Sequence, residues 1–211
     1  MHRSSKTRND SASRSSMRVE NLNQHQVQRL SKVFELWYLK APSNFTRRVR
    51  GRYWLSYLLL RYTGARIGEV FRLNDLTDID FDRNEVRILP SGSRTARGTG
   101  RTIPVPLMVI AQITDYRTEF PDMRGKVFAL DQGNFRREFY HRAEEAEIPR
   151  DLSHPQILRH TRAIEMLQAG VPLTAVQDLM GHVMSRTTTL YLRKTGIENT
   201  VRTILENKGL L

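Results

Sequence analysis

The stretch of sequence that decides the fold runs from Leu152 to Tyr191 and reads LSHPQILRHTRAIEMLQAGVPLTAVQDLMGHVMSRTTTLY. Its apolar residues recur at helical spacing on both sides of Gly170-Val171-Pro172, which predicts two helices joined by a short turn. A Gly-His pair follows, and then a run rich in serine and threonine that ends on a tyrosine. The stretch therefore holds an arginine, a histidine and a tyrosine that are candidates for chemistry: Arg159, His182 and Tyr191.

The first of these two helices has distinct faces. Gln156 and Arg159 are one turn apart and share a face. Ile157, Ile164 and Leu167 lie on another face, which we expect to pack toward the core. Arg159 is therefore expected to point out of a helix whose other side is buried.

The composition indicates a globular protein with a polyanionic partner. Of the 211 residues, 39% are hydrophobic and 27% are charged, which is an ordinary balance with ample length for a core. There are 34 Lys and Arg against 22 Asp and Glu, so the formal net charge is 34 − 22 = +12. Arginine far outnumbers lysine, and its planar fork suits phosphate. The alternative is a solvated basic face without a partner.

Several classes of site are excluded or unsupported. The chain has no cysteine, which excludes disulfides, thiolate zinc sites and cysteine nucleophiles. No His, Asp and Glu cluster has the spacing of metal ligands, so we expect neither a metal nor a cofactor. No apolar run is long enough to span a bilayer, and the N-terminus lacks the apolar core of a secretory signal. We expect a cytoplasmic protein that has access to DNA.

The rest of the chain predicts a mainly α fold with a small antiparallel β-sheet, an α+β domain. Residues 1–18 are rich in Ser and Arg and are expected to be a disordered basic tail, either an arm that touches DNA or merely a tail. Apolar spacing predicts helices from residue 23 to a break at 41–44 and over about 46–62, 66–73, 106–119, 132–147 and 197–207. Gly64 is expected to cap the second of them.

The sheet signals lie between the third and fourth of these helices. Short β-type runs occur at 79–81, 86–89 and 102–105, and Pro104 places the last of them at an edge. The polar segment 90–100 between the second and third runs is expected to form a flexible basic tip. Residues 126–128 are expected to be extended.

Three short motifs occur in order along this framework. They are Thr63-Gly64-Ala65-Arg66-Ile67-Gly68-Glu69, Leu158-Arg159-His160-Thr161 and Leu179-Met180-Gly181-His182, with Tyr191 nine residues after His182. With the β-hairpin between the first two, they resemble the motifs of the tyrosine recombinases, the phage integrase family, over roughly Val19 to Asn207. The resemblance implies a DNA breaking and rejoining catalytic domain over 19–211, without the N-terminal core-binding domain that members usually carry.

The resemblance also implies a mechanism. Tyr191 attacks a phosphodiester of double-stranded DNA, which gives a 3′-phosphotyrosyl bond and a free 5′ hydroxyl, and a 5′ hydroxyl of a partner strand reverses the step. The covalent link conserves the bond energy, so no ATP is implied. Because tyrosine has a pKa near 10, ionising it at pH 7 costs roughly 4 kcal/mol. Arg66 and Arg159 match the family's pair that grips the phosphate, and neutralising the charge that builds there offsets this cost.

Three further positions take roles from the same resemblance. His182 matches the third-motif His or Trp, which supports the phosphate or the tyrosine. Glu69 matches an acidic position that braces the active site, and His160 matches a second-motif histidine that is structural.

The two proton-transfer positions of the family are altered here. The second motif usually begins with a histidine, and this chain has Gln156, which donates a hydrogen bond but does not carry a proton. Whether His154 substitutes for it is open. The family also has a lysine on the hairpin, whereas no lysine occurs between Lys40 and Lys126. The nearest basic residues of the hairpin are Arg94 and Arg97, which neutralise charge but hold their protons tightly.

Two other features have alternative interpretations. The predicted helix at 46–62 begins with four arginines, which either contact the DNA backbone or form a simple surface: Arg47, Arg48, Arg50 and Arg52. The terminal helix at 197–207 either docks on a neighbouring subunit, as in the family's tetramer on two duplexes, or packs on its own domain.

The sequence thus favours a site-specific DNA recombinase or integrase, of a phage or another mobile element. The altered proton-transfer positions keep a second hypothesis open, a DNA-binding regulator or architectural protein that does not cleave. A third hypothesis is an enzyme similar to type IB topoisomerases, which shares the chemistry but acts on one duplex.

Overall fold

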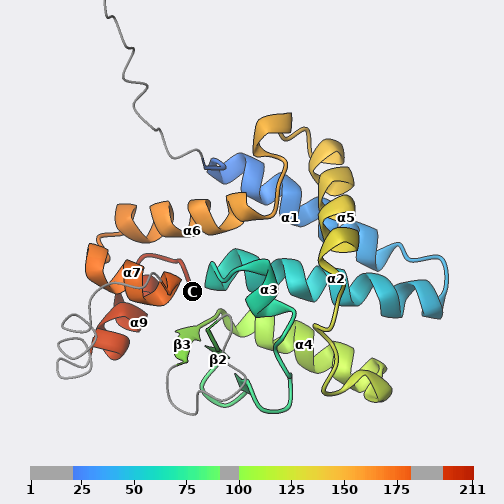
Figure 1. The fold of residues 1–211 in the computed structure, drawn as a ribbon, viewed down its shortest axis with the longest axis horizontal. Helices are drawn as coiled ribbons and strands as arrows, with labels where there is room; N and C mark the ends of the chain where they lie inside the picture. The colour runs from blue at the N-terminus through green and yellow to red at the C-terminus, as the bar shows by residue number, and fades with distance from the viewer. Residues whose placement is uncertain (1–20, 91–99, 182–196) are drawn as a thin grey trace, which may run out of the picture.

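The computed structural model describes residues 21–90, 100–181 and 197–211 (Figure 1). Helix α2 (Asn44–Thr63) crosses the middle of the molecule, with α6 (Gln156–Gln168) on one side and α4 (Leu107–Glu119) on the other. The Ser43 side chain caps its start by accepting a hydrogen bond from the backbone of Thr46. Its second half is buried almost all round, as is typical of a central helix.

Helices α1 (Gln24–Leu39) and α5 (Gln132–Glu145) pack together beside α2. Helix α1 begins with a capping box made by Asn23 and Gln26. The ring of Phe34 on α1 stacks on that of Tyr57 on α2, with 4.3 Å between the centroids. Short segments connect these helices: α3 (Ile67–Val70) and the 3₁₀ turns η1 (Pro121–Met123) and η2 (Arg150–Leu152).

The sheet is small and antiparallel. Its strands are β1 (Ile79–Asp80), β2 (Glu85–Ile88) and β3 (Arg101–Pro104), in the order β1-β2-β3. Val86 pairs with Ile103 and Ile88 with Arg101, and the apolar residues of these pairs are buried. β3 is an edge strand within the described part of the sheet, as Pro104 predicts.

The C-terminal helices form a second, smaller cluster. Helices α6 and α7 (Leu173–Met180) are joined at Gly170-Val171-Pro172, and α9 (Ile197–Asn207) covers them. Leu205 of α9 is buried in this cluster, and Arg202 donates to the carbonyl of Arg83 at 2.8 Å. In the single chain, α9 therefore packs on its own domain.

The predicted fold class is confirmed, and the helices and strands lie within a few residues of their predicted bounds. One exception is the segment at 126–128, expected to be extended, which contains a turn at Val127 and Phe128. The guanidinium group of Arg52 gathers the carbonyls of Lys126, Val127 and Ala129, which favours a turned backbone.

The predicted faces of α6 are also partly wrong. Ile157 is buried as expected, but Leu167 is 42% exposed and Ile164 is only partly buried. Arg159 points inward and is 6% exposed. The reason is that the carbonyls of Gly64 and Met180, at the ends of α2 and α7, accept hydrogen bonds from the arginine, which a leucine could not donate. Within the described ranges, no helix is long and apolar enough to cross a membrane.

Candidate functional site

Arg66 and Glu69, from the first motif, lie at the sharp turn that follows α2. Helix α2 ends at Gly64, whose left-handed φ of 63° suits glycine. Arg66 then takes the N-cap position of α3, and its backbone N–H donates to Oε2 of Glu69 at 2.7 Å. The Glu69 carboxylate is 1% exposed, whereas the Arg66 side chain is 45% exposed and its Nη1 lies 3.5 Å from Oε1. The carboxylate thus braces the backbone of an arginine whose head is free to reach a ligand.

Arg159, from the second motif, enters the same place from α6. Its Nη1 donates to the carbonyl of Gly64 at 2.7 Å, and its Nη2 donates to the carbonyl of Met180 at 2.6 Å. These carbonyls lie at the C-terminal ends of α2 and α7, where helices have unpaired acceptors and negative dipole ends. Burial lowers the pKa of Arg159 to about 10, helped by the positive charges of Arg66 and Arg101 and opposed by that of Glu69. Arg159 is still cationic at pH 7.

Arg101, at the start of β3, is a member of the site that the sequence analysis missed. Its Nη1 and Nη2 donate to Oε1 and Oε2 of Glu69 at 3.2 and 2.8 Å, and its Nε donates to the carbonyl of Leu179 at 2.6 Å. The side chain is 14% exposed. The sequence could have indicated this burial, because residues two apart on a strand share a face and Arg101 is two residues before the buried Ile103.

We call Arg66, Arg101, Arg159 and Glu69 the arginine cluster. It has three guanidinium groups and one carboxylate, a formal charge of 3 − 1 = +2. Burial raises the pKa of Glu69, but hydrogen bonds from Arg101 and the Arg66 backbone, with their charges, outweigh burial and leave the pKa below its ordinary value. The carboxylate is therefore ionised at pH 7. The excess positive charge favours an anion with several oxygen acceptors, such as a phosphate.

Gln156 and His160, also from the second motif, lie near residues of the cluster. Gln156, the first residue of α6, is exposed and lines a cavity of about 170 Å³ together with His154, Arg136 and Tyr140. Burial lowers the pKa of His160, and the nearby His154 and Arg159 lower it further. His160 is therefore neutral at pH 7, as suits a structural histidine.

The four arginines at the start of α2 are not brought to the cluster. They lie 12 to 17 residues before Gly64, which is roughly 18 to 25 Å along the helix at about 1.5 Å per residue. All four have partners within the domain: Arg47 pairs with Glu119, Arg48 with Asp122, Arg50 with the carbonyl of Trp37 and Arg52 with three carbonyls of the 126–129 turn. These contacts link α2 to neighbouring parts of the domain, and the contact of these arginines with DNA stays a prediction.

Four candidate residues lie outside the described residues: His182, Tyr191, Arg94 and Arg97. The predicted tail lies outside them as well. Residues that border these undescribed segments in the sequence nevertheless belong to the arginine cluster or contact it. Gly181, the residue before His182, lies against the guanidinium group of Arg101, and Arg101 follows the hairpin tip closely. Across the described part of the chain, no group of three or more His, Asp and Glu side chains is placed to hold a metal.

The family model described as "Phage integrase family" matches residues 20–196. The chain belongs to this family. It is 35% identical over 170 residues to tyrosine recombinase XerC of Roseiflexus castenholzii, covering 75% of this chain and 52% of that protein. It is 31% identical over 180 residues to XerC of Actinobacillus succinogenes, covering 82% and 56%. The chain thus spans about half the length of the curated relatives it matches.

Solved structures of recombinases share the fold. The crystal structure of XerA recombinase matches with a TM-score of 0.63 at 21% identity, covering 84% of this chain and 59% of that one. The Tn1549 transposon integrase, in complex with transposon right end DNA, matches with a TM-score of 0.60 at 18% identity, covering 92% and 67%. The resemblance to the tyrosine recombinases that the three motifs indicate is confirmed.

Proposed function

We propose that this protein cleaves and rejoins double-stranded DNA at specific sites through a 3′-phosphotyrosyl intermediate, with Tyr191 as the nucleophile. The observation that carries the proposal is the arginine cluster. Arg66 and Arg159 come from motifs far apart in the sequence, yet both lie close enough to the buried carboxylate of Glu69 to feel its charge, and the cluster as a whole is positively charged. Membership of a family of recombinases supports the same function.

The cluster suits the phosphate at the cleavage point. In this proposal the exposed Arg66 binds a non-bridging oxygen, and the buried Arg159 adds positive charge close to it. Because the Arg159 side chain and the Arg66 backbone are held by partners within the protein, little reorganisation is needed when charge builds on the phosphate. Pre-organised charge of this kind is the main contribution a protein makes to phosphate chemistry.

The reaction itself balances without a cofactor. The Tyr191 hydroxyl loses its proton and its oxygen forms a bond to phosphorus, while the bond from phosphorus to the 5′ oxygen breaks and the 5′ oxygen takes up one proton to leave as a hydroxyl, so no net proton is gained or lost. The reverse attack by a 5′ hydroxyl restores the DNA and the tyrosine. His182 supports the phosphate or Tyr191. Gln156 donates a hydrogen bond, and Arg94 or Arg97 approaches from the hairpin to neutralise charge.

Assembly is part of the proposal. A homotetramer on two duplexes, held together by α9, accounts for strand exchange between two DNA sites. Because α9 packs on its own domain in the single chain, assembly requires it to exchange those contacts for contacts with a neighbour. Leu205 and Arg202 are the residues whose contacts change.

A non-cleaving DNA-binding protein is the second candidate. The observation that favours it is the loss of both usual proton carriers, with Gln156 in place of a histidine and no lysine between Lys40 and Lys126. An enzyme similar to type IB topoisomerases is distinguished from a recombinase by acting as a monomer on one duplex.

The test uses end-labelled duplexes, each with a single nick, taken from the DNA that flanks the gene. After incubation with the protein or with Tyr191→Phe, a denaturing gel separates covalent adducts from free strands. We expect a slow band that protease removes and that Tyr191→Phe does not form. A shift seen only in native gels, over a range of pH and sequences, would favour the non-cleaving candidate.

A further inference from the structure

Arg101 connects three parts of the candidate site that are far apart in the sequence. It begins β3, and its guanidinium group contacts Glu69 of the first motif and the carbonyl of Leu179 in the third. Its three nitrogens have three separate acceptor atoms. A side chain used in this way is fully committed to partners within the protein.

We infer that Arg101 is a positioning residue for strand cleavage: it keeps Arg66 available to the phosphate and fixes the point from which the segment bearing His182 and Tyr191 departs. The inference rests on the proposed function. Arg101 acts through Glu69 and through the end of α7, and it has no role here as a proton donor.

The first half of the role follows from competition for Glu69. The carboxylate is almost fully buried, and Arg101 engages both of its oxygens at 3.2 and 2.8 Å. Arg66 makes only a loose side-chain contact with it, at 3.5 Å, because the better positions are taken. Without Arg101, the buried charge needs another cation, and Arg66 is the nearest exposed one. Arg66 would then turn onto Glu69 and away from the phosphate.

The second half concerns the end of α7. Two consecutive carbonyls are held from different elements, Leu179 by Arg101 of β3 and Met180 by Arg159 of α6. Gly181 follows with a φ of 65°, and a Cβ at this residue would lie 2.6 Å from Nη1 of Arg101. The positive φ therefore favours glycine, and a larger residue would displace the guanidinium group of Arg101. His182 is the next residue, so the catalytic segment starts from a fixed point.

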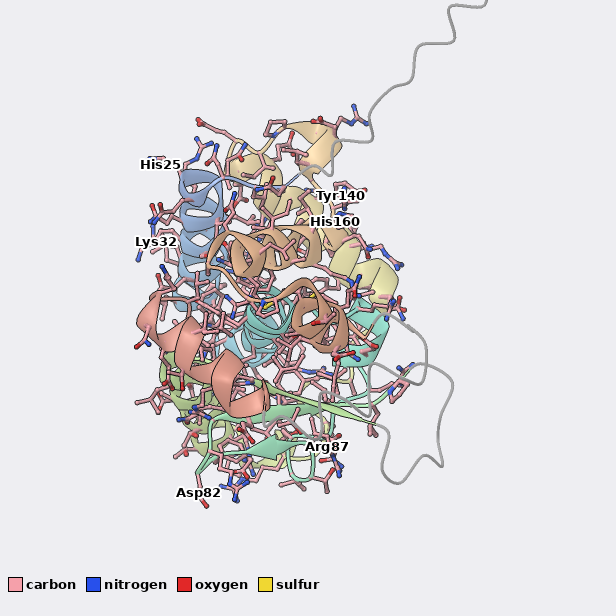
Figure 2. All side chains as sticks on the ribbon, turned by 90° about the vertical axis from the view of Figure 1, so that its left-hand side faces the viewer. His25, Lys32, Asp82, Arg87, Tyr140 and His160 are labelled. Atoms are coloured by element: carbon pink, nitrogen blue, oxygen red, sulfur yellow. The ribbon has the colours of Figure 1, made fainter. Side chains whose placement is uncertain are left out.

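The test compares Arg101→Met with Arg101→Lys and with a matched control, Arg87→Met. Arg87 lies on the neighbouring strand β2 and pairs with Asp78 at 3.0 Å, and Figure 2 shows it on the sheet, well away from His160 of α6. We measure the rate of adduct formation with saturating protein and, separately, the DNA affinity. We expect Arg101→Met to slow the rate by about 100-fold, as a small misplacement of reacting groups does, with affinity changed less than about 3-fold. Arg101→Lys should recover part of the rate, and Arg87→Met should resemble the wild type.

A double variant separates positioning from a purely structural role. In Arg101→Met/Glu69→Gln the buried charge that captures Arg66 is gone, so we expect a faster rate than in Arg101→Met alone. If Arg101 only holds the fold together, the double variant is as slow as the single one or slower. That result, or a loss confined to affinity, would overturn the inference. If Arg101→Met does not fold, Arg101→Lys and its combination with Glu69→Gln decide the question.

Failure of the proposed function is distinguishable from failure of the inference. If the wild type forms no adduct, cleavage by this protein is refuted. Amide hydrogen exchange then decides whether Arg101 holds the two segments. We expect faster exchange over 64–73 and 173–181 in Arg101→Met, and not in Arg87→Met. Unchanged exchange in both segments would show that Arg101 positions neither.

Discussion

Replacing Glu69 by glutamine tests whether the buried carboxylate organises the cluster. The carboxylate is 1% exposed and accepts from both terminal nitrogens of Arg101 and from the Arg66 backbone. Removing one charge of a buried pair costs about 3–5 kcal/mol, because the other charge is left without compensation. Glutamine keeps the shape and one acceptor oxygen, so we expect the lower end, a loss of about 3 kcal/mol in the free energy of unfolding at pH 7.

The assay is urea unfolding followed by circular dichroism, and the control is Glu119→Gln. Glu119 also pairs with an arginine, Arg47, at 2.6 Å, but its side chain is 35% exposed. Exposed pairs contribute about 0–1 kcal/mol, so the control should change stability by less than about 1 kcal/mol. If Glu69→Gln costs no more than Glu119→Gln, the reasoning from burial is refuted.

The same comparison has a pH dependence with a definite sign. The pKa of Glu69 is lower in the folded protein than its ordinary value, so the ionised carboxylate stabilises the fold above the unfolded pKa of about 4.3. This stabilisation is lost as the pH falls through the folded pKa. The difference between the wild type and Glu69→Gln should therefore be constant near neutrality and should narrow below about pH 4.3. A difference that stays constant into acid would contradict the assignment.

Three further predictions concern the residues around the cluster. Gly181→Ala should lower the free energy of unfolding by about 1–2 kcal/mol because of its φ of 65°, and it should also slow adduct formation by displacing Arg101. Gly170→Ala, with a φ of 87° and no atom within 4 Å of the added Cβ, should lower the free energy of unfolding without slowing adduct formation. Urea unfolding measures the first effect and the adduct gel the second. Arg159→Lys should abolish the adduct in denaturing gels while native gels still show DNA binding, because a single ammonium does not span two helix ends; an adduct at the wild-type level would refute this role. Gln156→His should raise the adduct rate by about 100-fold and add a pH dependence near 6.5, since imidazole carries a proton where the amide does not. A rate independent of this change would place proton transfer elsewhere.

The fold could be predicted where local rules decide the structure. Helix ends follow from capping residues, such as Ser43 at the start of α2 and the left-handed Gly64 at its end. The edge strand follows from Pro104, since proline has no N–H for a further partner. These features depend on a few neighbouring residues, so spacing along the chain is enough to find them.

The buried arginines could not be predicted in the same way. Arg162 of α6 is 1% exposed and donates to the carbonyl of Leu210, and Arg159 donates to carbonyls of α2 and α7. These three acceptor carbonyls belong to residues that are 21 to 95 positions away in the sequence. An amphipathic pattern assigns arginine to the solvent, and only the packed structure supplies the acceptors that make burial favourable.

The candidate site was predictable in part for a related reason. The resemblance of the motifs to those of the tyrosine recombinases pointed to Arg66, Glu69 and Arg159, and the structure brings them together. Arg101 belongs to no motif, and its role depends on a strand, a turn and a helix end meeting. The roles of Tyr191 and His182 rest on the family resemblance and stay predictions.

The most direct test of cleavage by Tyr191 is to identify the residue that carries the DNA. Trypsin cuts after Arg186 and Arg193 and releases the peptide TTTLYLR, residues 187–193, in which Tyr191 is the only tyrosine. The adduct from a nicked duplex is isolated, trimmed with nuclease, digested and analysed by mass spectrometry. We expect this peptide to carry a nucleotide through a tyrosyl phosphate, and we expect the modification to be absent from Tyr191→Phe. A nucleotide on any other peptide, or an unmodified peptide recovered from every DNA complex, would contradict the proposed mechanism.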